Sequence, residues 1–171
     1  VATAAIEGAD VVMLSDETAM GKYPVEAVKA MSKTILYAQK NLPVNPLYAR
    51  EGSDKRRDSI AESAVILADR TDADAIVVET TSGQMARNIA IHRPNCPIIA
   101  VASDQRVANQ LALLYSTHSL YGEAGSGAEV SNQLYEKGFF GDSKPATVVL
   151  VRRSEGVEPP IANTVQLQII G

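Results

Sequence analysis

The sequence predicts an α/β fold in which a doubly wound, largely parallel sheet is covered by helices on both faces. Two observations support this prediction. Short apolar runs alternate along the chain with segments whose apolar residues recur at helical spacing, a pattern typical of parallel sheets with crossover helices. Apolar residues make up 46% of the 171 residues but aromatic residues only 5%. Ala and Val therefore dominate, which suits closely packed α/β layers better than an aromatic-rich β-sandwich.

The alternation is most regular after residue 57. Residues 75–78 form an entirely apolar run, typical of a strand buried on both faces of a sheet. Further strands are expected at 98–102, 119–122, 147–151 and 164–170. Ser59 and Glu62 have the spacing of a capping box and predict the start of a helix. The other helices are expected at 82–92, around Val107, Leu111 and Leu114, and at 129–137.

The N-terminal part predicts one further strand and one helix. Residues 11–14 are a continuous apolar run, and we expect a buried strand there, followed by a polar loop. Pro24 is favoured in the first turn of a helix, which would continue with Val25, Val28, Met31 and Ile35 on one face. Residues 41–52 contain two prolines and no periodicity, so we place a boundary between two structural units there. Because the chain begins at Val1 inside a helical pattern, we expect a fragment of a longer protein.

Composition argues against several classes of protein. The net charge of −4 leaves no basic stripe for nucleic acid, and the Lys55–Arg57 cluster is interpreted as the solvated start of a helix. No apolar run approaches the roughly 20 residues that cross a membrane. The single Cys96 fits a reducing compartment, so we expect a cytoplasmic protein. His92 and His118 lack metal-ligand spacing, and no metal site is expected.

A first candidate site lies between the expected strand at 75–78 and the helix that follows it. Thr80, Thr81 and Ser82 supply hydroxyls, and Gly83 allows close approach of the backbone. With the free N–H groups of a helix start, these residues could form a phosphate cradle. An ordinary helix N-cap explains the same residues, and a complete P-loop would also contain a Lys. Composition alone favours the N-cap.

A second candidate site is the polar loop at residues 15–21. Asp16 and Glu17 could ligate a cation or act as an acid/base pair. Adjacent side chains on an extended loop point apart, however. Without further information a solvated loop with one capping residue is favoured.

Two stretches of the sequence match the motifs of a known family. Residues 8–28 read G-A-D-V-V-M-L-S-D-E-T-A-M-G-K-Y-P-V-E-A-V. This stretch resembles the pyruvate kinase family, which has a similar motif on its last barrel strand and the following helix. Residues 73–102 contain D-A-I-V-V, T-T-S-G and R-P-N-C-P-I-I-A-V, which are similar to a strand, a loop and a second strand of the family's C-terminal domain. The likeness is strong up to about residue 115 and looser beyond it.

The resemblance implies a more specific architecture. Residues 1–48 would be the end of the (β/α)8 catalytic barrel, a βα remnant of a TIM barrel. Residues 49–171 would be a three-layer α/β/α domain with a mixed five-stranded sheet whose last strand is antiparallel. The complete enzyme would transfer a phosphoryl group from phosphoenolpyruvate to ADP with Mg²⁺ and K⁺. The family's catalytic residues and metal ligands lie earlier in the barrel, so no catalytic residue and no cofactor is expected in this chain.

The resemblance also assigns the two candidate loops. The first would be the family's effector site, which in many members binds a phosphate of a sugar phosphate such as fructose 1,6-bisphosphate; it comprises Thr80, Thr81, Ser82, Gly83, Gln84 and Met85. The second would border the active site without performing catalysis; it comprises Ser15, Asp16, Glu17 and Thr18.

Three departures from the family pattern modify these expectations. Gln84 and Met85 replace an Arg and a hydroxyl residue that many members have. Residues 158–164 replace a glycine-rich loop with a Gly-free segment that contains Glu158. We therefore expect insensitivity to fructose bisphosphate and, if an effector binds, a monophosphate. Asp16 stands where the family has Gly, and would be a tolerated replacement if that position required a positive φ.

The resemblance implies a homo-oligomer, usually a homotetramer in the complete enzyme, with subunit contacts made by the C-terminal domain. Two alternatives remain open. The chain could be a freestanding module of the same fold that binds a phosphorylated metabolite without catalysis, or a purely structural interaction domain. An isolated barrel strand at the N-terminus would have no use in a freestanding module.

Overall fold

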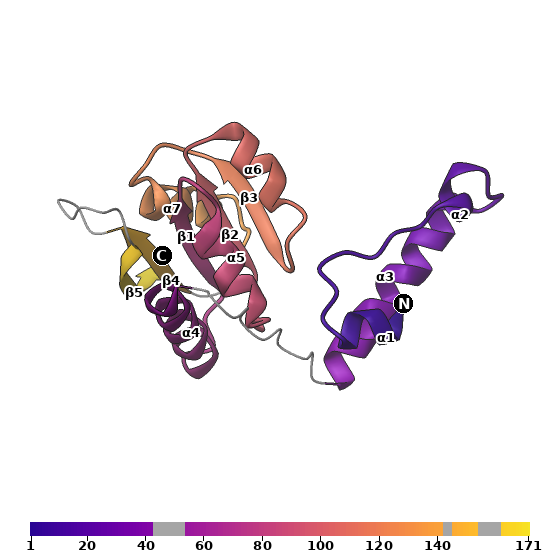
Figure 1. Cartoon of the computed structure of the whole chain (residues 1–171), viewed down its shortest axis with the longest axis horizontal. Coiled ribbons are helices and arrows are strands. Elements are labelled where there is room, and N and C mark those ends of the chain that lie inside the picture. The colour runs from indigo at the N-terminus through magenta and orange to yellow at the C-terminus, as the bar shows by residue number, and fades with distance from the viewer. Residues whose placement is uncertain (43–53, 142–144, 154–161) are drawn as a thin grey trace. The chain divides into compact units, whose positions relative to one another are not determined.

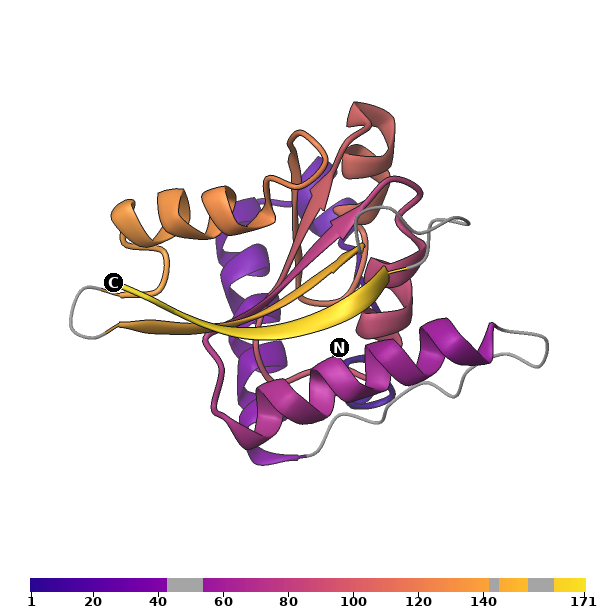
Figure 2. The ribbon, with the colours of Figure 1, turned by 90° about the vertical axis from the view of Figure 1, so that its left-hand side faces the viewer.

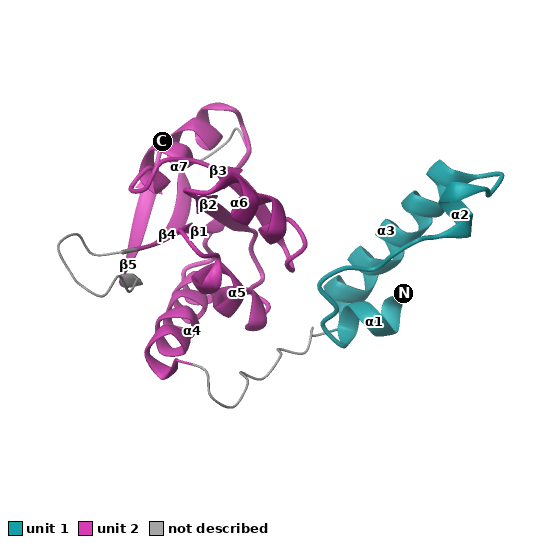
Figure 3. Ribbon diagram, turned by 45° about the horizontal axis from the view of Figure 1, so that its top comes forward, with its two compact units in different colours: residues 1–47 teal, residues 48–171 magenta. Residues whose placement is uncertain are grey.

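The computed structural model describes residues 1–42, 54–141, 145–153 and 162–171. The chain divides into two compact units, Val1–Leu47 and Tyr48–Gly171 (Figure 3). Much of the expected boundary at 41–52 lies outside the described residues. Each unit is therefore considered by itself.

The second unit is built on one mixed sheet in the order β3-β2-β1-β4-β5 (Figure 1). The central strand β1 pairs in parallel with β2 and β4, β3 pairs in parallel with β2, and β5 runs antiparallel to β4. This confirms the mixed five-stranded sheet with an antiparallel last strand. The strands are β1 Ala75–Thr80, β2 Ile98–Ala102, β3 Thr117–Tyr121, β4 Ala146–Arg153 and β5 Ala162–Ile170.

Helices cover both faces of this sheet and give three layers (Figures 1 and 2). Alternate residues of β1 face opposite sides, because successive side chains of a strand point to opposite faces. Ile76 and Val78 pack in a core with α4, α5 and α6. Ala75 and Val77 pack in a second core with α7. The helices are α4 Lys55–Arg70, α5 Gln84–Ile91, α6 Gln105–Leu111 and α7 Gly127–Glu136.

An aspartate sets the start of α4. The carboxylate of Asp54 accepts a hydrogen bond from the backbone N–H of Arg56 at 3.1 Å, so α4 begins at Lys55. The predicted capping box at Ser59 and Glu62 is wrong. Ser59 lies inside α4, and its hydroxyl donates to the carbonyl of Lys55 at 2.8 Å. The local spacing was right for a cap, but an aspartate one turn earlier satisfies the helix N–H groups first.

The first unit contains three helices and, among its described residues, no strand. They are α1 Ala2–Ile6, α2 Asp16–Ala19 and α3 Pro24–Asn41, with Pro24 in the first turn of α3 as predicted. The predicted strand at 11–14 is not formed. A strand is held by hydrogen bonds to its neighbours, and here the side chains of Val11 and Met13 are 58% and 86% exposed. The apolar run therefore has the composition of a buried strand without a sheet to join.

None of the helices in the described parts of the chain has the length and apolar content needed to cross a membrane.

Candidate functional site

The loop after β1 is shaped by its own hydroxyl and glycine residues. The hydroxyl of Thr80 accepts a hydrogen bond from the backbone N–H of Gly83 at 2.8 Å. Gly83 has a φ of +77°, a conformation that glycine adopts without steric cost. A side chain at this position would also lie against Leu111 and Val107 of α6. The loop therefore requires glycine both for its backbone conformation and for close packing.

The loop also contacts the end of the neighbouring strand. The backbone N–H of Ser103, directly after β2, donates to the carbonyl of Thr80 at 3.3 Å. The hydroxyls of Ser103 and Thr81 lie 3.5 Å apart. The loop thus lies at the carboxyl ends of two parallel strands, the edge at which open α/β sheets bind ligands.

The residue before α5 is Gly83, which has no side chain to cap the helix, so the ordinary Ser or Thr N-cap is not formed. The N–H of Gly83 is bound by Thr80, and the N–H of Gln84 points at the Ser82 hydroxyl at 3.4 Å. The second contact is long and therefore weak. Met85, expected in the effector set, is only 5% exposed and packs in the core, so its side chain cannot contact a ligand at the surface. Thr81 and Ser82 are exposed.

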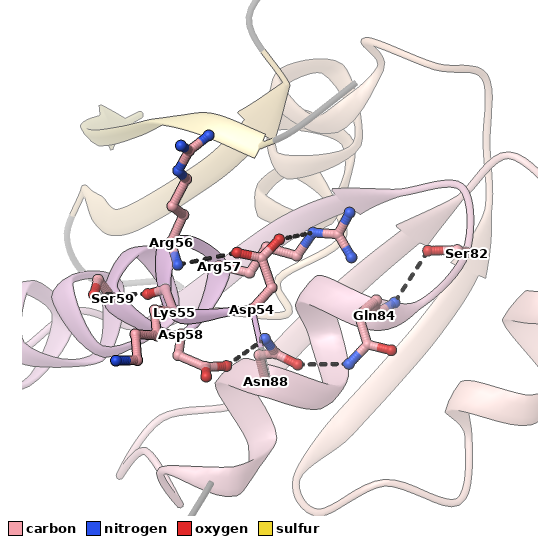
Figure 4. A network of polar contacts seen from close by, with 9 residues as sticks. All are labelled: Asp54, Lys55, Arg56, Arg57, Asp58, Ser59, Ser82, Gln84 and Asn88. Carbon is pink, nitrogen blue, oxygen red and sulfur yellow. Dashed lines mark hydrogen bonds and ion pairs between the residues drawn. The ribbon is translucent and has the colours of Figure 1, made fainter. Parts of the chain in front are cut away.

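Gln84 belongs to a chain of side-chain hydrogen bonds between α4 and α5 (Figure 4). Its amide nitrogen donates to Oδ1 of Asn88 at 2.7 Å, and Nδ2 of Asn88 donates to the carboxylate of Asp58 at 2.8 Å. Asn88 is only 5% exposed. A carboxylate only accepts hydrogen bonds, so Asp58 orients the amide of Asn88, which in turn orients the amide of Gln84.

No local pattern indicates this network, because Asp58 and Asn88 lie 30 residues apart. Spacing within one helix could have paired Gln84 with Asn88, which are neighbours at i and i+4. The contact with Asp58 depends on the packing of α4 against α5.

The basic cluster at the start of α4 does not form a patch. The side chains of Lys55, Arg56 and Arg57 extend in different directions (Figure 4). Arg57 lies 3.4 Å from the carboxylate of Asp54. This agrees with the interpretation of the cluster as a solvated helix start.

Glu79 lies beside the loop in sequence but contributes to the other face of the sheet. Its carboxylate accepts a hydrogen bond from the N–H of Gly127, the first residue of α7, at 2.8 Å. A negative charge is favourable at a helix N-terminus. A side chain on Gly127 would collide with Glu79 and Leu150. Sequence reasoning missed this cap, since the two residues are 48 positions apart.

The second candidate loop forms the short helix α2 in the first unit. The backbone N–H of Ser15 donates to the Glu17 carboxylate at 3.1 Å, and the Thr18 hydroxyl donates to the carbonyl of Ser15 at 3.2 Å. Hydrogen bonds from the backbone N–H groups of Glu17 and Ser15 lower the pKa of Glu17. Asp16 is the first residue of α2 and does not have a positive φ, so the backbone conformation at this position does not require glycine. The side chain of Ser15, the residue before α2, forms no cap hydrogen bond. The side-chain contacts of the loop are made by Glu17 and Thr18.

Two further groups of candidate residues show no sign of chemistry. Within the described ranges, no set of three or more His, Cys, Asp and Glu side chains is arranged to hold a metal ion. Cys96 is a buried free thiol. Burial, followed by the charge of Asp69, raises the pKa of Cys96 to about 11. The thiol is therefore protonated at neutral pH and unreactive.

The fold defines a class: a three-layer α/β domain with a mixed five-stranded sheet, and a loop of hydroxyl residues and glycine at the carboxyl ends of β1 and β2. A family model described as "Pyruvate kinase, alpha/beta domain" matches residues 58–167, more than half of the chain. The chain belongs to the pyruvate kinase family.

Curated relatives agree with this assignment. The chain is similar to a pyruvate kinase of Geobacillus stearothermophilus, with 38% identity over 122 residues, 70% of this chain and 21% of the relative. It is also similar to a pyruvate kinase of Naumovozyma castellii, with 34% identity over 160 residues, 91% of this chain and 32% of the relative. The chain thus spans between about a fifth and a third of the length of these relatives.

Proposed function

We propose that this chain is the C-terminal part of a pyruvate kinase. In this proposal residues 1–48 are the end of the catalytic barrel, and residues 49–171 are the effector-binding and oligomerisation domain. The match of the α/β domain supports it, together with the motif at residues 8–28. The complete enzyme is cytoplasmic and glycolytic, and transfers a phosphoryl group from phosphoenolpyruvate to ADP with Mg²⁺ and K⁺ neutralising charge.

The chain alone performs no phosphoryl transfer in this proposal. Ser15, Glu17 and Thr18 border the active site of the complete enzyme, but all three are used here in local hydrogen bonds. The test is a coupled assay of pyruvate formation by the purified chain with phosphoenolpyruvate, ADP, Mg²⁺ and K⁺. We expect no pyruvate above the rate without protein. Sustained formation of pyruvate by the chain would contradict the proposal.

The loop from Thr80 to Gln84 is proposed to bind the phosphate of a monophosphate effector. Its position at the carboxyl ends of β1 and β2 supports this, as do the exposed hydroxyls of Thr81 and Ser82. Of the segment 158–164, which we expect to disfavour a second phosphate, residues 158–161 lie outside the described residues. Calorimetric titration tests the proposal: inorganic phosphate should bind, and fructose 1,6-bisphosphate should bind no more tightly. Micromolar binding of the bisphosphate would overturn it.

A freestanding phosphate-binding module is the second candidate. The observation that favours it is that the second unit has apolar cores on both faces of its own sheet. The two candidates differ in what the first unit does. If the gene encodes nothing barrel-like before residue 1, the freestanding module is correct.

The proposed subunit contact uses β5, an outer strand of the sheet. Proteins commonly protect edge strands from pairing with charged side chains or proline. The sequence of β5, ANTVQLQII, contains neither. Ile169 is 74% exposed and Leu167 is also exposed. We expect the chain to self-associate and Ile169→Lys to shift it toward monomer in sedimentation. A monomeric wild-type chain at micromolar concentration would argue against this contact, and would leave the family assignment intact.

A further inference from the structure

Arg87 is the cationic side chain that the structure places at the loop. Its Nη1 donates to the backbone carbonyl of Ser82 at 3.4 Å. Side chains on a helix lean toward its N-terminus, so a residue one turn into α5 can reach back to the loop that precedes the helix. The contact uses one of the five N–H donors of a guanidinium.

The side chains of Gln84 and Glu79, which neighbour the loop in sequence, are directed away from its exposed hydroxyls. Gln84 donates its amide N–H to Asn88, and in Figure 4 its side chain extends toward Asn88 while its backbone nitrogen faces Ser82. Glu79 is the carboxylate nearest the loop in sequence, and it is bound to the N–H of Gly127 on α7. Gln84 is thus directed toward α4, and the negative charge of Glu79 toward the other side of the sheet.

We propose that Arg87 provides the cationic contact for phosphate at the Thr80–Gln84 loop, and that Asn88 and Asp58 keep Gln84 out of the binding site. This inference rests on the phosphate site proposed above and names its specificity-determining residue. A guanidinium forms short, charge-assisted hydrogen bonds with phosphate oxygens. The contact between Nη1 of Arg87 and the Ser82 carbonyl is long at 3.4 Å, but it places the guanidinium beside the loop that carries the exposed hydroxyls.

The test is calorimetric titration of the 171-residue chain with inorganic phosphate at constant ionic strength. Loss of a charge-assisted contact should weaken binding about tenfold in Arg87→Met. Arg70→Met is the matched control, because it removes the same charge at the exposed last residue of α4, outside the loop, and it should change the affinity less than about twofold at constant ionic strength. Arg87→Lys keeps the charge but loses the planar fork, so its affinity should fall between wild type and Arg87→Met.

The outcomes separate the two proposals. If wild type binds phosphate and Arg87→Met binds equally well, the inference is wrong and the phosphate site stands. The inference also fails if Arg70→Met weakens binding as much as Arg87→Met. It fails likewise if Gln84→Met does, because the Gln84 side chain would then contact the phosphate. If wild type does not bind phosphate at millimolar concentration, both fail. The ¹⁵N signal of the Arg87 Nε in the wild-type chain is a readout that needs no variant: it should shift on addition of phosphate, and an unchanged signal with saturated binding would contradict the inference.

Discussion

The two units of this chain carry similar apolar segments but place them differently. In the second unit the apolar residues of β1, β2 and β4 are buried between helices on both faces. In the first unit the apolar run at 11–14 forms no strand, and Val25 and Val28 on α3 are exposed. An apolar pattern thus predicts which face of a segment will be buried, but burial requires neighbouring elements to cover that face.

This difference should appear most strongly in the cost of removing apolar atoms. Ile76 is fully buried in β1, and Ile76→Ala should lower the free energy of unfolding of the second unit by about 2–5 kcal/mol because it leaves a cavity. Val28→Ala is the matched change on α3 and should cost less than about 0.5 kcal/mol. Urea unfolding followed by NMR measures both costs, with the signals of β1 for Ile76→Ala and those of α3 for Val28→Ala. Equal costs would mean that α3 is as well packed as β1.

The contact of Glu79 with α7 should have the next largest effect. Gly127→Ala places a methyl group against Glu79 and Leu150, and we expect a loss of about 1–3 kcal/mol from the overpacked contact. Glu79→Gln keeps the shape of the side chain and should cost less than Gly127→Ala. The same unfolding experiment reports both variants. If Gly127→Ala is as stable as wild type, α7 does not approach the sheet as closely as described.

Removal of a helix cap should have a smaller effect. The carboxylate of Asp104 accepts hydrogen bonds from the N–H groups of Arg106 and Val107 at 2.7 and 3.1 Å. Asp104→Ala should therefore cost about 1 kcal/mol. Gln105→Ala at the exposed first residue of α6 is the control and should be near neutral. If Asp104→Ala lowers the free energy of unfolding no more than Gln105→Ala does, α6 does not depend on this cap.

The smallest effect is expected in the first unit, at Glu17. Its pKa is lowered by backbone hydrogen bonds, so the ionised form is favoured when α2 is formed. Its contribution to α2 is therefore present above the pKa of an ordinary glutamate and is lost as the pH falls through the lowered value. An NMR titration of the Glu17 carboxyl carbon should give a midpoint below 4.5, the ordinary value. A midpoint at or above that value would show that the Ser15 contact is not formed.

Local patterns were sufficient to predict most of the second unit. Strand β2 was predicted with its bounds, and the apolar run at 75–78 lies within β1. These runs are buried on both faces, so their composition alone identifies them. The antiparallel direction of β5 came from the family resemblance, because strand direction leaves no mark in local composition.

The candidate site was predictable in part. The loop could be predicted because its hydroxyl residues and glycine are typical of a turn before a helix. Thr80 and Gly83 indeed form the hydrogen bond and the positive φ that shape it. Neither the burial of Met85 nor the Asp58–Asn88 contact could be predicted, since both depend on how α5 packs against the sheet and α4. The strand predicted at 11–14 is not formed, although its residues have the composition of a buried strand. In the described structure no neighbouring strand pairs with it.

Amide hydrogen exchange of the whole 171-residue chain tests the contrast between the two units most directly. An isolated helix is only marginally stable in water, whereas core strands exchange through unfolding of their whole domain. We predict slow exchange in β1, β2 and β4 and exchange at least about a hundredfold faster in α3. Protection of α3 equal to that of β1 would contradict the account, because it would show that the first unit is as stably folded as the second.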